Sequence, residues 1–338
     1  MKIALDAMGG DYAPEATIQG AVWAARDFGI QVELVGQPQV IEAELKKHDT
    51  SSLSLSMASA SQVVRMDEDP AAAVKSKPDS SMVVGAQMLK RGEVDAFVTA
   101  GHTGGGLAAA LLHIGRIPGI KRPALCTAYP VSSEAGLCIV LDIGASPDCR
   151  PDYLYQYALM GSVYSEATLG VSNPRVAVLS NGEEEGKGSR LVKDALPLLN
   201  QGPFNFIGNV EGKDVPAGLA DVVVTDGFTG NVFLKTSEGV AKLLVDAIKS
   251  GVAGGSLPVK LGALLARPAL QSAATKLDYR EFGGATLLGV DGIVVIAHGR
   301  SRGYAVRNAV RLSVRCVSGD VLGTIKSRLK TARTQAED

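Results

Sequence analysis

Several short runs in this chain are apolar at every position instead of alternating with polar residues. Val222-Val223-Val224 and Ile293-Val294-Val295-Ile296 are the clearest examples. A strand with one face in water alternates, whereas a strand buried on both faces is apolar throughout. Because sheets buried on both faces are mostly parallel and covered by helices, these runs favour an α/β fold.

Ten β-rich runs recur along the chain, separated by longer segments with helical spacing. Val240, Leu243 and Leu244, for example, fall on one face of a helix. Pro14 and Pro151 stand where a first helical turn is expected, the part of a helix that tolerates proline best. The alternation predicts a mostly parallel sheet covered by helices. The predicted strands are residues 2–8, 32–36, 53–57, 94–99, 124–129, 137–143, 175–179, 205–210, 221–225 and 293–297.

Length and composition limit the class of protein. The 338 residues are 46% hydrophobic, enough to bury a large core. We expect a single α/β unit over residues 1–338, with two lobes meeting near residues 145–150 as the alternative. The 34 basic and 35 acidic residues nearly cancel, which argues against a nucleic-acid partner. Any anionic partner must therefore meet a local basic patch.

Cysteines and apolar segments point to a reduced, cytoplasmic protein. The four cysteines show no C-x-x-C spacing and no grouping with the four histidines, so we predict no metal and no cofactor. No apolar signal segment precedes the first strand, and no run of about eighteen apolar residues occurs.

Glycine-rich polar loops follow five of the predicted strands. Glycine lets backbone N–H groups approach an anion, and the following helix adds the positive end of its dipole. Because ligands bind beyond the carboxyl ends of parallel strands, we expect the five loops to meet at one edge of the sheet and hold a phosphate-like anion. Taken singly, each loop is also what a strand-to-helix turn requires. The loops are residues 6–11, 99–106, 181–182, 226–231 and 297–301.

Two nucleotide-binding patterns are only superficially present. Gly104-x-Gly106-x-x-Ala109 resembles a dinucleotide fingerprint, but the next strand ends in Tyr129 and Pro130 without the ribose-binding acid. Lys187, between two glycines, lacks the glycine pattern of a Walker loop. Its segment is either a solvated acidic turn or a phosphate contact.

Taken together, the loop motifs resemble the phosphate acyltransferase family of bacterial phospholipid synthesis, over nearly the whole chain. The resemblance implies a three-layer α/β/α sandwich, like phosphate acetyltransferases and isocitrate dehydrogenases. It also implies transfer of a long-chain fatty acyl group from acyl carrier protein to inorganic phosphate. His102 and Ser146 stand where the family usually has Asn. The motifs are residues 6–11, 100–104, 122–125, 141–145, 208–212, 226–231, and 283–285 through 288–292 to 298–299.

Site residues follow from the loops and this chemistry. A phosphate oxygen attacks the thioester carbonyl, so the protein must orient phosphate and stabilise an oxyanion, and needs no nucleophile of its own. We predict Lys187 as a positive contact and Asp226 or His298 as proton handlers; a helix cap for Asp226 and a structural role for His298 are the alternatives. The predicted substrate-binding residues are Gly9, Gly10, Asp11, Gly101, His102, Thr103, Gly104, Gly105, Asn181, Thr229, Gly230 and Asn231.

Partners follow mainly from the resemblance, which implies a homodimer in peripheral contact with the membrane and with the downstream membrane acyltransferase. Residues 253–277 are amphipathic, with Leu257, Leu261, Leu264 and Leu265 on one face, and either contact the membrane or pack on protein. Acyl carrier protein is acidic, and basic residues near Pro118 or along Arg307, Arg311 and Arg315 are candidate docking sites.

Three other hypotheses stay open. The first is a short-chain phosphate acetyl- or butyryltransferase that uses coenzyme A. The second is a non-catalytic, membrane-associated scaffold that docks the carrier. The third concerns mechanism: a cysteine could accept the acyl group, although Cys126, Cys138 and Cys316 lie inside apolar runs.

Overall fold

A single sheet of eleven strands forms the centre of the protein, in the order β3-β2-β1-β4-β11-β10-β5-β6-β9-β7-β8. The computed structural model describes residues 1–133, 136–276 and 279–337. Residue 277 of the predicted amphipathic segment and residue 338 lie outside these ranges. The strands are β1 (Lys2–Asp6), β2 (Gln31–Gly36), β3 (Leu55–Ser59), β4 (Ala96–Thr99), β5 (Ala124–Pro130), β6 (Leu137–Leu141), β7 (Arg175–Leu179), β8 (Asn205–Val210), β9 (Val222–Val224), β10 (Ala285–Leu288) and β11 (Ile293–Ile296).

Helices connect most of the strands. Pro151 occupies the first turn of α6, and Pro14 directly precedes α1, as the sequence predicts. The helices are α1 (Glu15–Phe28), α2 (Pro38–Leu45), α3 (Pro70–Ser76), α4 (Ser81–Lys90), α5 (Thr103–Ala109) with the π-helical turn η1 (Ala110–Ile114), α6 (Pro151–Leu169), α7 (Arg190–Asn200), α8 (Asp214–Ala217), α9 (Gly227–Gly254), α10 (Leu257–Lys276), α11 (Tyr279–Phe282), α12 (Gly303–Ser318) and α13 (Val321–Glu337).

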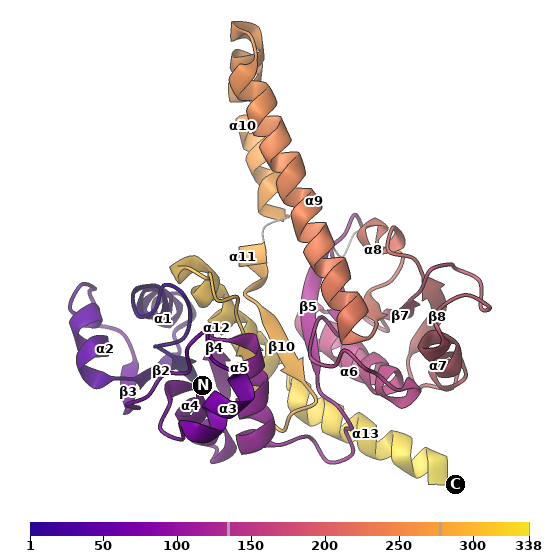
Figure 1. Cartoon of the computed structure of the whole chain (residues 1–338), viewed down its shortest axis with the longest axis horizontal. Coiled ribbons are helices and arrows are strands. Elements are labelled where there is room, and N and C mark those ends of the chain that lie inside the picture. The colour runs from indigo at the N-terminus through magenta and orange to yellow at the C-terminus, as the bar shows by residue number, and fades with distance from the viewer. Residues whose placement is uncertain (134–135, 277–278, 338) are drawn as a thin grey trace.

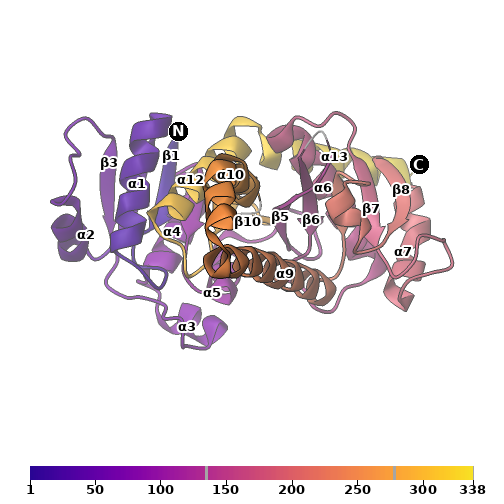
Figure 2. The same ribbon diagram turned by 90° about the horizontal axis from the view of Figure 1, so that it is seen from above.

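Both faces of the sheet are buried, which confirms the three-layer α/β/α sandwich. Ile3 and Leu5 of β1 belong to a core cluster with Ile18 of α1, whereas Ala4, between them, packs with Met82 of α4 on the other face. Alternate residues of one strand point to opposite faces, so an apolar run needs a helix layer on each side. Seen from above, α3, α5 and α9 lie on one side of the sheet and α12 and α13 on the other (Figure 2).

The sheet is mostly parallel, but its direction reverses in the middle. Strand β10 pairs antiparallel with both β11 and β5, and β5 pairs antiparallel with β6. As a result β1 to β4 and β11 run one way, whereas β6, β7, β8 and β9 run the other way. The expectation that all five glycine-rich loops leave one edge of the sheet is therefore wrong, because the loops after β7 and β9 leave the opposite edge.

Strand β10, which runs antiparallel to both of its neighbours, was absent from the predicted strands. Its four residues, Ala285 to Leu288, are all buried. A run this short between two glycine-rich loops gives little signal on its own. The other predicted strands are present, and β7 and β8 have the predicted bounds.

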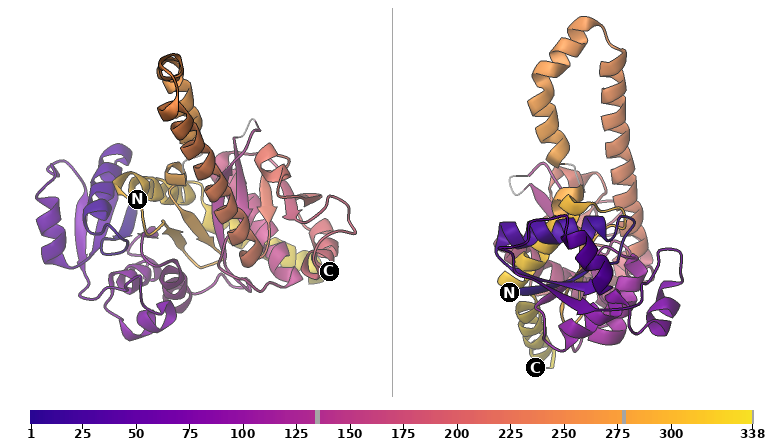
Figure 3. Two further views of the ribbon diagram at one scale, coloured as in Figure 1. Left: turned by 45° about the horizontal axis from the view of Figure 1, so that its top comes forward. Right: turned by 90° about the vertical axis from the view of Figure 1, so that its left-hand side faces the viewer.

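Helices α9 and α10 form a hairpin that projects away from the sheet (Figures 1 and 3). The helical prediction for Val240, Leu243 and Leu244 is confirmed, yet Leu243 and Leu244 are 67% and 58% exposed in the single chain. On α10, Leu257 and Leu265 are 71% and 84% exposed. Among the described residues, no helix combines the length and the apolar character needed to cross a membrane. The sheet is continuous through both halves, and a lobe boundary near residues 145–150 stays a prediction.

Candidate active site

The loops after β1, β4 and β11 pack directly on one another. The Asp11 N–H donates to the Gly299 carbonyl oxygen at 2.8 Å. Gly10 has a φ of +110°, and a Cβ there would lie 3.0 Å from the Ala100 oxygen and 3.2 Å from the Gly299 oxygen. Glycine is therefore required at position 10 for conformation and for space.

A buried carboxylate, Asp6, organises these loops from below. Its Oδ2 accepts a hydrogen bond from Thr99 Oγ1 at 2.8 Å, and its Oδ1 accepts one from the Met8 N–H at 3.1 Å. Thr99 Oγ1 in turn accepts from the Gly101 N–H at 3.0 Å. Burial raises the pKa of Asp6, while hydrogen bonds from Ser81 and Thr99 oppose that rise. Asp6 thus holds two loops together.

A second buried carboxylate, Asp142, organises the opposite edge. It accepts hydrogen bonds from four backbone N–H groups, those of Leu125, Gly144, Ala145 and Ser146, at 2.7 to 3.0 Å. Burial raises the pKa of Asp142, and these N–H groups act in the other direction. Ser146, where the family resemblance leads one to expect Asn, is part of this buried turn.

Helix α9 begins against the Asp142 turn. Asp226 is its N-cap: one carboxylate oxygen accepts from the Thr229 N–H at 2.8 Å and the other from Thr229 Oγ1 at 2.7 Å. This is the usual role of Asp before a helix. Asn231, in the first turn, packs over Gly144.

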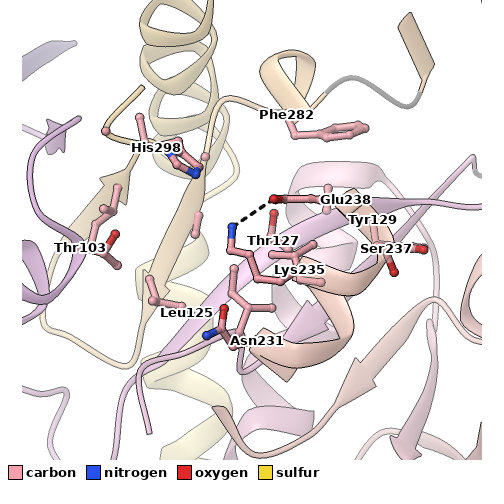
Figure 4. Close-up of a pocket in the computed structure, with 18 of the residues that line it drawn as sticks. Thr103, Leu125, Thr127, Tyr129, Asn231, Lys235, Ser237, Glu238, Phe282 and His298 are labelled. Carbon is pink, nitrogen blue, oxygen red and sulfur yellow. Dashed lines mark hydrogen bonds and ion pairs between the residues drawn. The ribbon is translucent and has the colours of Figure 1, made fainter. Parts of the chain in front are cut away.

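A cavity of about 400 Å³ lies between α9 and the central strands. Side chains from both edges of the sheet line this cavity (Figure 4). Asp11, Thr103 and His298 come from one edge, and Asn231 from the other. Apolar walls come from the strands and from α9, which suits an acyl chain. The apolar and aromatic lining includes Leu125, Tyr129, Ile143, Leu234, Ala241 and Phe282.

Charged groups gather at one part of this cavity. Lys235 Nζ lies 3.1 Å from Glu238 Oε2, one helical turn further along α9. Arg300 Nη2, from the loop after β11, lies 3.8 Å from the same oxygen. Figure 4 shows Lys235 and Glu238 of α9 joined by a dashed line, with His298 directed into the cavity.

His298 is held in one orientation and favours its neutral form. Its Nδ1 accepts a hydrogen bond from the Arg300 N–H at 3.4 Å. Partial burial lowers the pKa of His298, and the positive charges of Arg300 and Lys235 lower it further. With Nδ1 acting as acceptor, the neutral ring carries its proton on Nε2.

Four of the predicted residues line the cavity: Asp11, Thr103, Asn231 and His298. His102 lies just behind Thr103 and caps α5, where its Nδ1 accepts from the Gly104 N–H at 3.1 Å. Neither His102 nor the predicted residues that shape the surrounding loops belong to the lining. The loop-shaping residues are Gly9, Gly10, Gly101, Gly104, Gly105, Asp226, Thr229 and Gly230.

Asn181 and Lys187 lie elsewhere, on the loop after β7. Asn181 Oδ1 accepts from the Gly188 N–H at 2.8 Å, and the Lys187 side chain is exposed and packs over Gly182. Neither residue lines the cavity.

Lys235 and Glu238 were missed by the sequence reasoning. They follow Asn231 by four and seven residues, so they share its helix face. That spacing was available from the sequence, but only the approach of α9 to the central strands shows that this face lines a cavity.

Among the described residues, one cluster of three carboxylates has the spacing of a metal site: Glu183, Glu211 and Asp214. Lys213 pairs there with Glu211, and its ammonium group lies 3.5 Å from Glu183. The positive charge near these carboxylates is therefore that of a lysine side chain.

Comparison with known proteins identifies the family. Residues 1–323 match the model of a family described as fatty acid synthesis protein. A phosphate acyltransferase of Dictyoglomus turgidum is 49% identical over 322 residues, covering 95% of either chain. The chain belongs to the phosphate acyltransferase family. The phosphate acyltransferase of Desulfitobacterium hafniense is 48% identical over 330 residues, 97% of this chain and 98% of that one. This chain is therefore an acyltransferase whose acceptor is phosphate.

Solved structures agree with this family at the level of the fold. A phosphotransacetylase from Streptococcus pyogenes is similar with a TM-score of 0.60 at 17% identity, covering 93% of this chain and 94% of that one. A 4-hydroxythreonine-4-phosphate dehydrogenase from Klebsiella pneumoniae has a TM-score of 0.52 at 15% identity, covering 94% and 99%. The phosphate acyltransferase fold is thus shared with phosphotransacetylases and with a dehydrogenase.

Proposed function

We propose that this phosphate acyltransferase takes a long-chain fatty acyl group from the thioester of acyl carrier protein and transfers it to inorganic phosphate. A phosphate oxygen forms a bond to the carbonyl carbon, the carbon–sulfur bond breaks, and the sulfur leaves with a proton as the free thiol of the carrier. The products are an acyl phosphate and the carrier. The observation that carries this proposal is a cavity with cationic and polar groups at one part and apolar walls elsewhere.

Phosphate is placed beside Lys235, with Asn231 and Thr103 as neutral hydrogen-bond donors. All three line the cavity, and they come from both edges of the sheet. A lysine supplies positive charge, and an amide and a hydroxyl orient the oxygens. Asn181 and Lys187 stay predictions, as contacts made from the β7 loop.

His298 is placed at the thioester oxygen. Its ring is directed into the cavity, and its neutral form presents an N–H at Nε2. That donor would stabilise the negative charge that develops on the carbonyl oxygen. In this proposal His298 acts as a hydrogen-bond donor, which is a more specific role than the proton handling predicted from the sequence.

The acyl chain is placed along the apolar walls. Leu234 and Ala241 of α9 line the cavity together with Leu125 of β5 and Ile143, which follows β6. Burying methylene groups there stabilises the complex by about 0.8 kcal/mol per methylene. Such a surface favours a long chain over an acetyl group.

The hairpin is placed at an interface with the membrane, with a second copy of the chain, or with both. Exposed leucines on α9 and α10 form an apolar surface of a kind that soluble monomers rarely leave uncovered. Contact with a downstream membrane acyltransferase and carrier docking on local basic residues belong to the same proposal. Of the predicted basic residues, Arg307 and Arg311 already contact Asp27 and the Glu281 carbonyl oxygen.

One experiment tests the activity against its alternatives. The full chain is incubated with a long-chain acyl carrier thioester, with and without inorganic phosphate, and thioester loss and acyl phosphate are measured. We expect loss only with phosphate. Activity confined to acetyl- or butyryl-coenzyme A would support the short-chain alternative, toward which the phosphotransacetylase fold points. Binding of the carrier without thioester loss would support the scaffold.

A further inference from the structure

Glu238 joins two cations that come from distant parts of the chain. Its Oε2 lies 3.1 Å from Lys235 Nζ on α9 and 3.8 Å from Arg300 Nη2 on the loop after β11. The carboxylate lines the cavity, and its side chain is 25% exposed. Glu238 Oε2 therefore connects α9, which begins at one edge of the sheet, to the loop after β11, which lies at the opposite edge.

The positive charge of this region is compensated before any substrate enters. Lys235 and Arg300 face Glu238, and Asp11 adds a second carboxylate to the lining. The remaining polar groups named for phosphate, Asn231 and Thr103, are neutral. A phosphate that approaches Lys235 consequently meets the negative charge of Glu238 at close range, where like charges repel.

We propose that Glu238 is a positioning residue, which aligns Lys235 and Arg300 and is displaced from them by inorganic phosphate. This rests on the proposed function, because it takes phosphate as the ligand of Lys235. Phosphate binding is then an exchange of one anion for another. The exchange keeps the two cations in place at the expense of phosphate affinity.

Removing the charge of Glu238 should therefore strengthen phosphate binding. Glu238→Gln keeps the size of the side chain and removes the carboxylate that competes with phosphate for Lys235. Partly exposed ion pairs of this kind correspond to about a two- to fivefold change in affinity. The same substitution should lower the KM for phosphate and leave the KM for the thioester donor unchanged. A merely structural residue would not produce that separation.

The test is calorimetric titration of the full chain with inorganic phosphate. The variants are Glu238→Gln, Glu238→Ala and the control Asp246→Asn. Asp246 pairs with Lys242 at 2.9 Å on the same helix and does not line the cavity. Asp246→Asn removes one negative charge, as Glu238→Gln does, but away from the cavity. Thermal unfolding of each variant checks that it is folded.

We expect tighter phosphate binding in both Glu238 variants and parental binding in Asp246→Asn. Unchanged or weaker binding in folded Glu238 variants overturns the inference while leaving the proposed function intact. Equal tightening in Asp246→Asn also overturns it, because the effect would then come from net charge. A parental chain that turns over no thioester with phosphate and binds no phosphate overturns both.

Discussion

Gly230 lies so close to Asp142 that a Cβ at position 230 would be 1.9 Å from the Asp142 carbonyl oxygen. The first turn of α9 therefore packs directly on the buried turn that follows β6. This contact positions Asn231, and one turn later Lys235, over the central strands.

Gly230→Ala should destabilise the protein and displace α9. Overpacking of this kind costs about 1–3 kcal/mol, and here the contact is with backbone, which has little room to move. Urea unfolding measures the loss. Gly239→Ala is the matched control on the same helix: nothing lies within 4 Å of its Cβ position, and we expect about 0.5–1 kcal/mol of stabilisation. Equal stability of the two variants would contradict the packing described for α9.

Lys235→Met should raise the KM for phosphate about tenfold or more, because hydrogen bonds to a charged group contribute about 1.5–3 kcal/mol. Steady-state kinetics with varied phosphate measure it. Lys187→Met is assayed beside it, since that lysine is the contact predicted from sequence. A larger effect of Lys187→Met would move the phosphate site to the β7 loop.

His298→Ala should lower kcat about 100-fold, the usual cost of removing one donor to a developing oxyanion. Phosphate and donor affinities should change less than kcat. A rate within threefold of the parent in a folded variant would exclude His298 from the chemistry.

The lowered pKa of His298 also predicts a pH dependence. The ordinary value is 6.5, and in the folded protein the pKa lies below it. The rate should therefore be flat above about pH 6.5 and fall only at lower pH, where the ring becomes charged. Below pH 6.5 the unfolded chain binds a proton that the folded chain does not, so stability due to His298 is lost as pH decreases. If the rate already decreases as the pH is lowered from 8 to about 7, this assignment is contradicted.

Substitutions of Asp226 distinguish its role as a helix cap from a role as a proton handler in the reaction. Asp226→Ala should lower stability by about 1 kcal/mol, and Asp226→Ser should retain most of it, because serine also caps helices. Both stability and kcat are measured. If Asp226→Ser folds like the parent but loses turnover, the carboxylate acts in the reaction and the cap is only part of its role.

Much of the local structure is readable from the sequence. Val222-Val223-Val224 is a buried strand because no residue in it can face water, and Pro151 begins a helix because its missing N–H needs no partner there. The resemblance carried by the loop motifs agrees with the family that the comparisons identify. Thr103, Asn231 and His298 were predicted from the polar segments that follow three strands, and the structure places all three in the cavity lining.

The sequence by itself determined ten of the eleven strands, which loops carry polar groups, and which family the chain resembles, because each depends on local pattern. Only the tertiary structure decided that β10 is inserted antiparallel between β11 and β5 and that β5 pairs antiparallel with β6, so that the glycine-rich loops leave two edges instead of one. It also decided that α9 crosses the centre and brings Lys235 and Glu238 to Arg300. Strand direction and the pairing of distant segments arise from long-range packing, and the periodicity of a single strand or helix contains no information about its partner.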